Sequence, residues 1–152
     1  MGLGGEDAAQ ASTKLPPPLV IVEGFGADVS VIDEALRFIF DRYDVGTAQI
    51  AIGGFSDGAS YALSLGLTNG DLFTHIIAFA PGFAAPASLN GRPRIYISHG
   101  TQDRVLPIDR CSRRLVPRLR AEGYDVRYRE FDGGHTVPIE VRREAVEMFL
   151  AD

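Results

Sequence analysis

Residues 49–67 read QIAIGGFSDGASYALSLGL, and this stretch decides the fold. An apolar run at Gln49–Gly53 predicts a buried strand, and the alanine- and leucine-rich run Asp57–Leu67 predicts a helix. The letters GFSDG at residues 54–58 fit the pattern G-x-S-x-G, in which a serine lies on a strained turn from strand to helix. We expect both glycines to be required, because side chains there would collide. The hydroxyl of Ser56 would then stand above the end of a strand, although a glycine- and serine-rich turn without chemistry also fits these letters.

Strands and helices continue to alternate on both sides of this turn. Alternation at this spacing is typical of an α/β fold, and we expect a three-layer sandwich with a mainly parallel sheet of about five strands. Residues 80–94 are expected to form a loop, because they are rich in proline and glycine. The expected strands are 19–22, 49–53, 75–80, 94–98 and 126–131, and the expected helices are 29–43, 57–67, 108–122 and 138–150.

The composition is that of an ordinary globular domain. The chain has 152 residues, of which 45% are hydrophobic and 23% charged, and this length is enough for one domain with its own core. We expect residues 1–18 to be a flexible leader and residues 19–152 to form the domain. The net charge of −5, without a marked basic cluster, argues against nucleic acid as a partner.

Nothing in the sequence points to a membrane or an oxidising compartment. No segment approaches the roughly 18 apolar residues that a membrane span requires, and residues 1–14 lack the apolar core of a secretory signal. The single cysteine, Cys111, cannot form an internal disulfide. We therefore expect a cytoplasmic location and no membrane partner.

A serine hydroxyl becomes a good nucleophile only when a base accepts its proton and a third group orients that base. In a parallel sheet these partners are expected after later strands, in the order serine, acid, histidine. His135 fits the base, because it follows strand 126–131 on the glycine-rich loop FDGGH. Asp103 fits the acid, because it lies in the loop GTQDRVLP, residues 100–107, after strand 94–98.

Other acids and histidines fit these roles less well. Asp109 is expected in the first turn of helix 108–122, where an acidic residue complements the helix dipole, and Asp132 is expected to be a turn residue. His75 precedes its strand, at the wrong end of the sheet, and is expected at the surface or edge. We expect His99, which ends a strand before the acid, to brace the acid loop through hydrogen bonds. The three histidines have unrelated spacings, so no metal site is predicted.

Three short segments follow one another at predicted strand ends: GGFSDG at 53–58, HGTQD at 99–103 with Val105 and Pro107 after it, and GGH at 133–135. Together they resemble motifs of the α/β-hydrolase superfamily, most closely the small phospholipase/carboxylesterase-like and polyhydroxybutyrate-depolymerase-like esterases, from about residue 24 to residue 152. The resemblance implies Ser56 as nucleophile, Asp103 as orienting acid and His135 as general base. It also implies hydrolysis of a small-molecule carboxylic ester through an acyl-enzyme, without a cofactor.

The chain departs from that superfamily before the serine. Members have several strands there, and a His-Gly pair after the third strand supplies one N–H for the oxyanion. Here strand 19–22 resembles the third strand and is followed by Glu23 and Gly24. The N–H of Asp57, at the start of the serine helix, is expected to be one oxyanion donor. The N–H groups of Gly24 and Phe25 are expected to improvise the other within about 6 Å of the serine hydroxyl, unless the oxyanion hole is incomplete.

Phe25, Phe55 and Leu106 are expected to line an apolar acyl site. Two other functions stay open at this point. The first is a non-catalytic or impaired hydrolase-like domain, whose exposed sheet edge forms a homodimer or binds a partner. The second is a nucleotide-binding module, because residues 24–29 (GFGADV) resemble the start of a dinucleotide fingerprint. That fingerprint lacks its third glycine, and no acid follows the second strand to bind a ribose.

Overall fold

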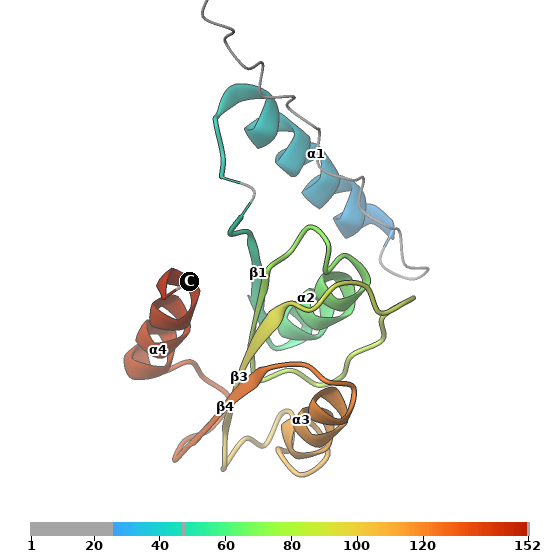
Figure 1. The fold of residues 1–152 in the computed structure, drawn as a ribbon. Helices are drawn as coiled ribbons and strands as arrows, with labels where there is room; N and C mark the ends of the chain where they lie inside the picture. The colour runs from blue at the N-terminus through green and yellow to red at the C-terminus, as the bar shows by residue number, and fades with distance from the viewer. Residues whose placement is uncertain (1–25, 47, 152) are drawn as a thin grey trace, which may run out of the picture.

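The computed structural model describes residues 26–46 and 48–151, which form four strands and four helices (Figure 1). Helices and strands alternate except between the second and third strands, which a loop joins. The predicted α/β fold is confirmed within these residues. The predicted strand at 19–22 and the predicted leader at 1–18 lie outside the described residues. In chain order the elements are α1 (Gly26–Arg42), β1 (Ala51–Phe55), α2 (Asp57–Thr68), β2 (His75–Phe79), β3 (Arg94–Gly100), α3 (Ser112–Ala121), β4 (Val126–Phe131) and α4 (Ile139–Leu150).

The described strands form one parallel sheet in the order β1-β2-β3-β4. The register pairs Phe55, the last residue of β1, with Phe79 of β2, and Gly100, the last residue of β3, with Phe131 of β4. Because all four strands run in the same direction, their carboxyl ends lie along one edge, where sites in open α/β sheets form. β1 is an end strand of this described sheet.

Helices cover both faces of the sheet (Figure 1). α2 and α3 pack on the face that carries Ile95 and Ile97 of β3. α4 covers the opposite face, where Val141 and Met148 pack with Tyr96. Successive side chains of a strand point to opposite faces, and both faces of β3 are apolar, as expected for a buried parallel strand. The three-layer arrangement predicted from the sequence is therefore present.

α1 packs beside α2 with one of its sides. Val29 is buried in a cluster with Leu65 of α2 and with Leu72 and Phe73, which follow α2. Four apolar side chains elsewhere on or just after the helix are exposed, namely Val31, Phe38, Ile39 and Tyr43. The helix thus buries only part of its apolar surface among the described residues. No helix in this part of the chain is long and apolar enough to cross a bilayer.

A row of hydroxyl side chains on α2, Ser60, Ser64 and Thr68, holds the predicted loop between β2 and β3 against the helix. Each hydroxyl donates to the carbonyl four residues earlier in the helix. Each also accepts from loop N–H groups, and Ser64 Oγ lies 2.9 Å from the N of Ala85. This hydroxyl row satisfies buried polar groups and fixes the loop at the same time.

The end of β3 and the start of α3 differ from the predicted boundaries, and the hydrogen bonds of the backbone explain both differences. β3 continues through Gly100, because its pairing with β4 extends past residue 98. α3 begins at Ser112 and not at residue 108, because the N–H of Cys111 bonds to the carbonyl three residues back, which makes a turn. The prediction that Asp109 lies in the first turn of that helix is therefore wrong. α1 also begins earlier than predicted, at Gly26.

Candidate active site

Ser56 lies on a strained turn directly after β1. Its φ of 60° and ψ of −123° fall in a region that non-glycine residues rarely adopt. Its N–H bonds to the carbonyl of Phe79 at 2.9 Å, which ties the turn to the neighbouring strand. A Cβ on Gly54 would collide with the backbone of Gly58 and Ala59, so glycine is required at residue 54. The turn that the sequence predicts at this position is present.

The second glycine of the pattern is not required for space. A Cβ on Gly58 would meet no atom within 4 Å, so the prediction that both glycines avoid a collision is wrong for this one. The close approach that needs a glycine comes from the strand side of the turn, where Gly54 lies against the first turn of the helix. Gly58 instead lies on the wall of a cavity described below.

Asp103 is buried within an otherwise mostly exposed loop after β3. Its Oδ1 accepts hydrogen bonds from the N–H groups of Val105 and Leu106, at 2.9 and 2.8 Å. Its Oδ2 lies 2.6 Å from Nδ1 of His135. Burial alone would raise the pKa of this carboxyl, but the hydrogen bonds from His135 and the two N–H groups hold it below the ordinary value of 3.8. The side chain is therefore a fixed, ionised acceptor.

His135 reaches this acid because the loop after β4 packs tightly on the end of β3. A Cβ on Gly100 would collide with the carbonyl oxygens of Gly133 and Gly134, so glycine is required at that contact. The N–H of Gln102 also bonds to the carbonyl of Gly133 at 2.9 Å. The part of the histidine loop that precedes His135 is thus fixed to the acid loop.

The imidazole of His135 connects the acid to the serine. Nε2 lies 3.0 Å from Ser56 Oγ, and Nδ1 lies 2.6 Å from the carboxylate of Asp103. A carboxylate only accepts, so Nδ1 carries the proton and Nε2 is free to accept from the serine hydroxyl. The structure thus brings together all three residues that the sequence predicts for these roles, in the orientation that a serine–histidine–acid mechanism needs.

The predicted oxyanion and substrate residues are only partly described. The N–H of Asp57 lies in the first turn of α2, where no earlier helical carbonyl can accept it. Gly24 and Phe25 lie outside the described residues, so their predicted positions are not tested. The ring of Phe55 lies 4.7 Å from the His135 imidazole and is 40% exposed. Leu106 is half-buried and lies against the loop after β2.

The competing acids and the first histidine have other partners. Asp109 pairs with Arg113 at 2.8 Å, and Asp132 accepts from Gln102 at 2.5 Å. His75 lies at the amino end of β2, far along the strand from Ser56, as predicted. Its predicted exposure is wrong, because His75 is only 2% exposed and α4 covers it with an edge contact from Phe149.

His99 and Cys111 are both buried beside the acid loop. His99 is fully buried and bonds to the Leu106 carbonyl within that loop, which is the bracing contact that the sequence predicts. Burial raises the pKa of the Cys111 thiol, which does not favour a reactive thiolate. Among residues 26–46 and 48–151, no cluster of histidine, cysteine and acidic side chains is arranged to hold a metal.

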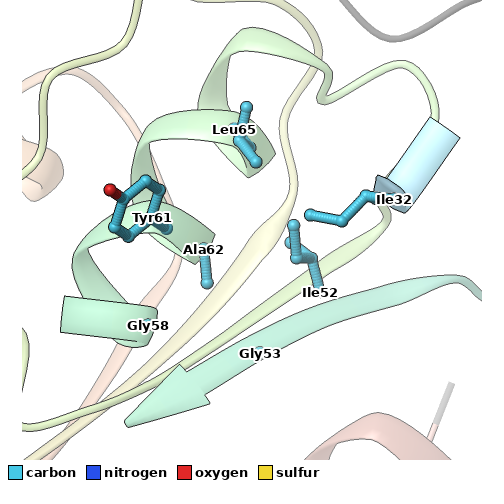
Figure 2. Close-up of a pocket in the computed structure, with 7 residues that line it drawn as sticks. All are labelled: Ile32, Ile52, Gly53, Gly58, Tyr61, Ala62 and Leu65. Carbon is cyan, nitrogen blue, oxygen red and sulfur yellow. The ribbon is translucent and has the colours of Figure 1, made fainter. Parts of the chain in front are cut away.

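A cavity of about 390 Å³ lies between α1, β1 and α2. Figure 2 shows Ile32 of α1, Ile52 of β1 and Tyr61 and Leu65 of α2 around it, with Gly58 at the foot of α2. The sequence did not predict this cavity, because its walls come from three separate elements. Each apolar side chain in the walls has the spacing expected of an ordinary core residue. The spacing of Tyr61 and Leu65 on one helix face was the available signal.

Comparison with known proteins identifies relatives. A family model described as phospholipase/carboxylesterase matches residues 21–151. Esterase PE8 shares 30% identity at a TM-score of 0.68, covering 78% of this chain and 58% of that one. A phospholipase/carboxylesterase from Dyadobacter fermentans shares 23% identity at a TM-score of 0.63, covering 80% and 61%. Acyl-protein thioesterase 2 from Zea mays shares 19% at a TM-score of 0.56, covering 68% and 55%.

These relatives are longer than the chain, which spans less than two thirds of each of the three structures. No curated protein matches the chain. The two structures below 25% identity support the fold alone, whereas the family model extends over most of the sequence, including all three residues gathered at the site.

Proposed function

Because the chain belongs to the phospholipase/carboxylesterase family, we propose that it is a serine hydrolase that cleaves small carboxylic esters through an acyl-enzyme. One observation carries this proposal. Ser56 Oγ, the His135 imidazole and the Asp103 carboxylate form a continuous hydrogen-bonded chain, with contacts of 3.0 and 2.6 Å. Neither a non-catalytic domain nor a nucleotide-binding module needs these three groups in this order.

In the first half of the proposed reaction, Ser56 Oγ attacks the carbonyl carbon of the ester. Its proton passes to Nε2 of His135, and the buried carboxylate of Asp103 stabilises the resulting imidazolium. The carbonyl electrons move to oxygen, and the N–H of Asp57 at the start of α2 faces the negative charge. The intermediate collapses as His135 returns the proton to the departing alkoxide, which leaves as the alcohol.

In the second half, water cleaves the acyl-enzyme. His135 takes a proton from the water, the hydroxyl attacks the acyl carbon, and the imidazolium then protonates Ser56 Oγ as the acid leaves. We propose that Gly24 or Phe25 supplies the second oxyanion donor, which the family resemblance motivates. One missing donor of this kind costs on the order of 10²–10³ in kcat, so this contribution decides how efficient the enzyme is.

An apolar acyl group suits the surroundings of the serine. Phe55 presents an exposed ring beside His135. Leu106 lies on the acid loop, where its side chain would be in about van der Waals contact with a Cβ at Gly82. We propose that Phe55 and Leu106, together with Phe25, contact the acyl or alcohol part of the substrate.

Turnover of p-nitrophenyl acetate and butyrate tests the proposal. We expect the unmodified protein to release p-nitrophenol with saturation kinetics, and Ser56→Ala to lower kcat by roughly 10³-fold or more. Ser88→Ala, at an exposed serine of the loop after β2, is the matched control and should be as active as the unmodified protein. Equal rates for the unmodified protein and Ser56→Ala would end the serine-hydrolase proposal.

The position of β1 favours one alternative. Within the described sheet, β1 is an end strand, and such an edge offers backbone groups to another strand. A non-catalytic domain that dimerises through this edge would show concentration-dependent sedimentation and no difference between Ser56→Ala and the unmodified protein. The same sedimentation experiment tests whether the chain forms a homodimer, whichever function it has.

A further inference from the structure

His99 is a buried histidine that the proposed proton path does not use. Its side chain has no exposure to solvent, and both ring nitrogens have partners. Nδ1 lies 2.6 Å from the hydroxyl of Ser112, the first residue of α3. Nε2 lies 2.8 Å from the carbonyl oxygen of Leu106 and 3.3 Å from Oδ2 of Asp103. His99 therefore touches Asp103 in the interior, where neither side chain is exposed.

The partners determine which nitrogen carries the proton. A carbonyl oxygen and a carboxylate can only accept, so Nε2 of His99 must be the donor. In the neutral ring Nδ1 is then an acceptor, and the hydroxyl of Ser112 donates to it. Ser112 is itself fully buried, so its hydroxyl is confined to this arrangement. The carbonyl of Leu106 and the carboxylate of Asp103 thus select the tautomer with the proton on Nε2, and the hydroxyl of Ser112 satisfies Nδ1 as a donor.

Two groups of the site depend on this donor. Oδ2 of Asp103 receives Nδ1–H of His135 on one side and faces Nε2–H of His99 on the other. Leu106 is held at both backbone groups, because its N–H bonds to Asp103 and its carbonyl accepts from His99. Rotation of the carboxylate would break several of these contacts together.

We infer that His99, whose Nδ1 is held by the buried hydroxyl of Ser112, is a positioning residue that fixes the Asp103 carboxylate toward His135 and sets the place of Leu106. The inference rests on the proposed function, since it assigns a role within the same site. His99 touches no reacting atom and acts through Asp103.

Two substitutions of His99 separate positioning from simple space filling. The amide nitrogen of glutamine reaches the place of Nε2 and can donate to Leu106 and Asp103, whereas asparagine reaches only the place of Nδ1, next to Ser112. We expect His99→Gln to keep kcat for p-nitrophenyl butyrate within about 3-fold, and His99→Asn to lower it roughly 10-fold or more, the rate equivalent of one hydrogen bond to a charged group. Equal kcat values in the two folded variants would overturn the inference.

Two substitutions of Ser112 change the site less than those of His99, so they test the inference even if a His99 variant fails to fold. Ser112→Ala removes the donor to Nδ1, and Ser112→Thr retains it. In ¹⁵N-resolved NMR spectra we expect His99 to be protonated at Nε2 in the unmodified protein and in both Ser112 variants, because Leu106 and Asp103 accept there in all three. Protonation at Nδ1 in the unmodified protein would contradict the inference.

The downfield proton between Asp103 and His135 supplies a readout that does not need turnover. It should be sharp in the unmodified protein and in Ser112→Thr, and broadened or lost in Ser112→Ala. A resonance unchanged in Ser112→Ala would show that His99 does not position the acid. If the unmodified protein hydrolyses no ester, the proposed function fails, while these spectra still decide whether His99 holds Asp103.

Discussion

At the scale of single residues, the site depends on a carboxylate that is buried but fully hydrogen-bonded. The side chain of Asp103 has no exposure, and its two oxygens accept from two backbone N–H groups and from His135. A buried carboxylate without donors would be protonated and could not orient an imidazole. The turn at residues 103–106 therefore keeps the buried carboxylate of Asp103 ionised, because its N–H groups donate hydrogen bonds to that carboxylate.

Asp103→Asn tests this role of the charge. The amide does not fix the imidazole in the tautomer whose Nε2 accepts from Ser56, so we expect kcat to fall by about 10³–10⁴-fold, as in other serine–histidine–acid sites. Asp109→Asn is the matched control, because Asp109 pairs with Arg113 at the surface, and it should stay near the unmodified rate. Initial rates with p-nitrophenyl butyrate measure both. A fully active Asp103→Asn would assign the acid to another residue.

At the scale of elements, the turn between β1 and α2 is asymmetric. Only the strand-side glycine lies against backbone, whereas the helix-side glycine faces open space. Gly54→Ala should therefore displace Ser56 and lower kcat at least about 10-fold, since small misplacements of a catalytic group are costly. Gly58→Ala, the matched variant on the other side of the serine, should be much less affected. The reverse ranking in esterase assays would contradict the geometry.

The hydroxyl row on α2 lies outside the site, so we expect substitutions in it to lower the free energy of unfolding. Ser64→Ala removes the acceptor of the part-buried hydrogen bond from the N–H of Ala85, which should lower the free energy of unfolding by about 0.5–1.5 kcal/mol. Ser88→Ala, which removes an exposed hydroxyl that accepts from Asn90, should change it by less than about 0.5 kcal/mol. Urea unfolding measures both, and equal effects would mean that the loop is not held by this row.

Sequence patterns predicted the parts of the fold that depend on local periodicity. The alternation around Ser56 and the glycine-rich loop before His135 identified elements and site residues whose positions the described structure matches. Patterns failed where contacts between distant segments decide. The burial of His75 depends on α4, and the cavity beside Tyr61 depends on three elements. The start of α3 was missed for a local reason, because separate turns after Pro107 precede the helix.

At the scale of the whole molecule, parallel strands bring residues from positions 56, 103 and 135 to one edge of the sheet. This convergence links the site to global stability, because the pKa of Asp103 is held below its ordinary value only in the folded arrangement of three loops. The chain spans 58% of esterase PE8, so the described sheet corresponds to part of that longer protein.

The pH dependence of unfolding tests this link. Since the pKa of Asp103 is lower in the folded protein than its ordinary value of 3.8, the folded state binds fewer protons through this window. Its contribution to stability is therefore fully present above that value and is lost as the pH falls through the folded pKa. We expect the stability advantage over Asp103→Asn in urea unfolding to be constant near neutral pH and to shrink below about pH 4. An advantage that grows on acidification would contradict the assigned direction.

The most direct test of the account is whether Ser56 becomes covalently modified. A fluorophosphonate probe reacts when an activated serine attacks phosphorus and fluoride leaves, so peptide mass spectrometry identifies the residue without an ester substrate. We predict a single adduct on Ser56, absent from Ser56→Ala and formed far more slowly in His135→Gln. An adduct that forms equally in Ser56→Ala, or a folded protein that forms none, would contradict the assignment of Ser56 as the nucleophile.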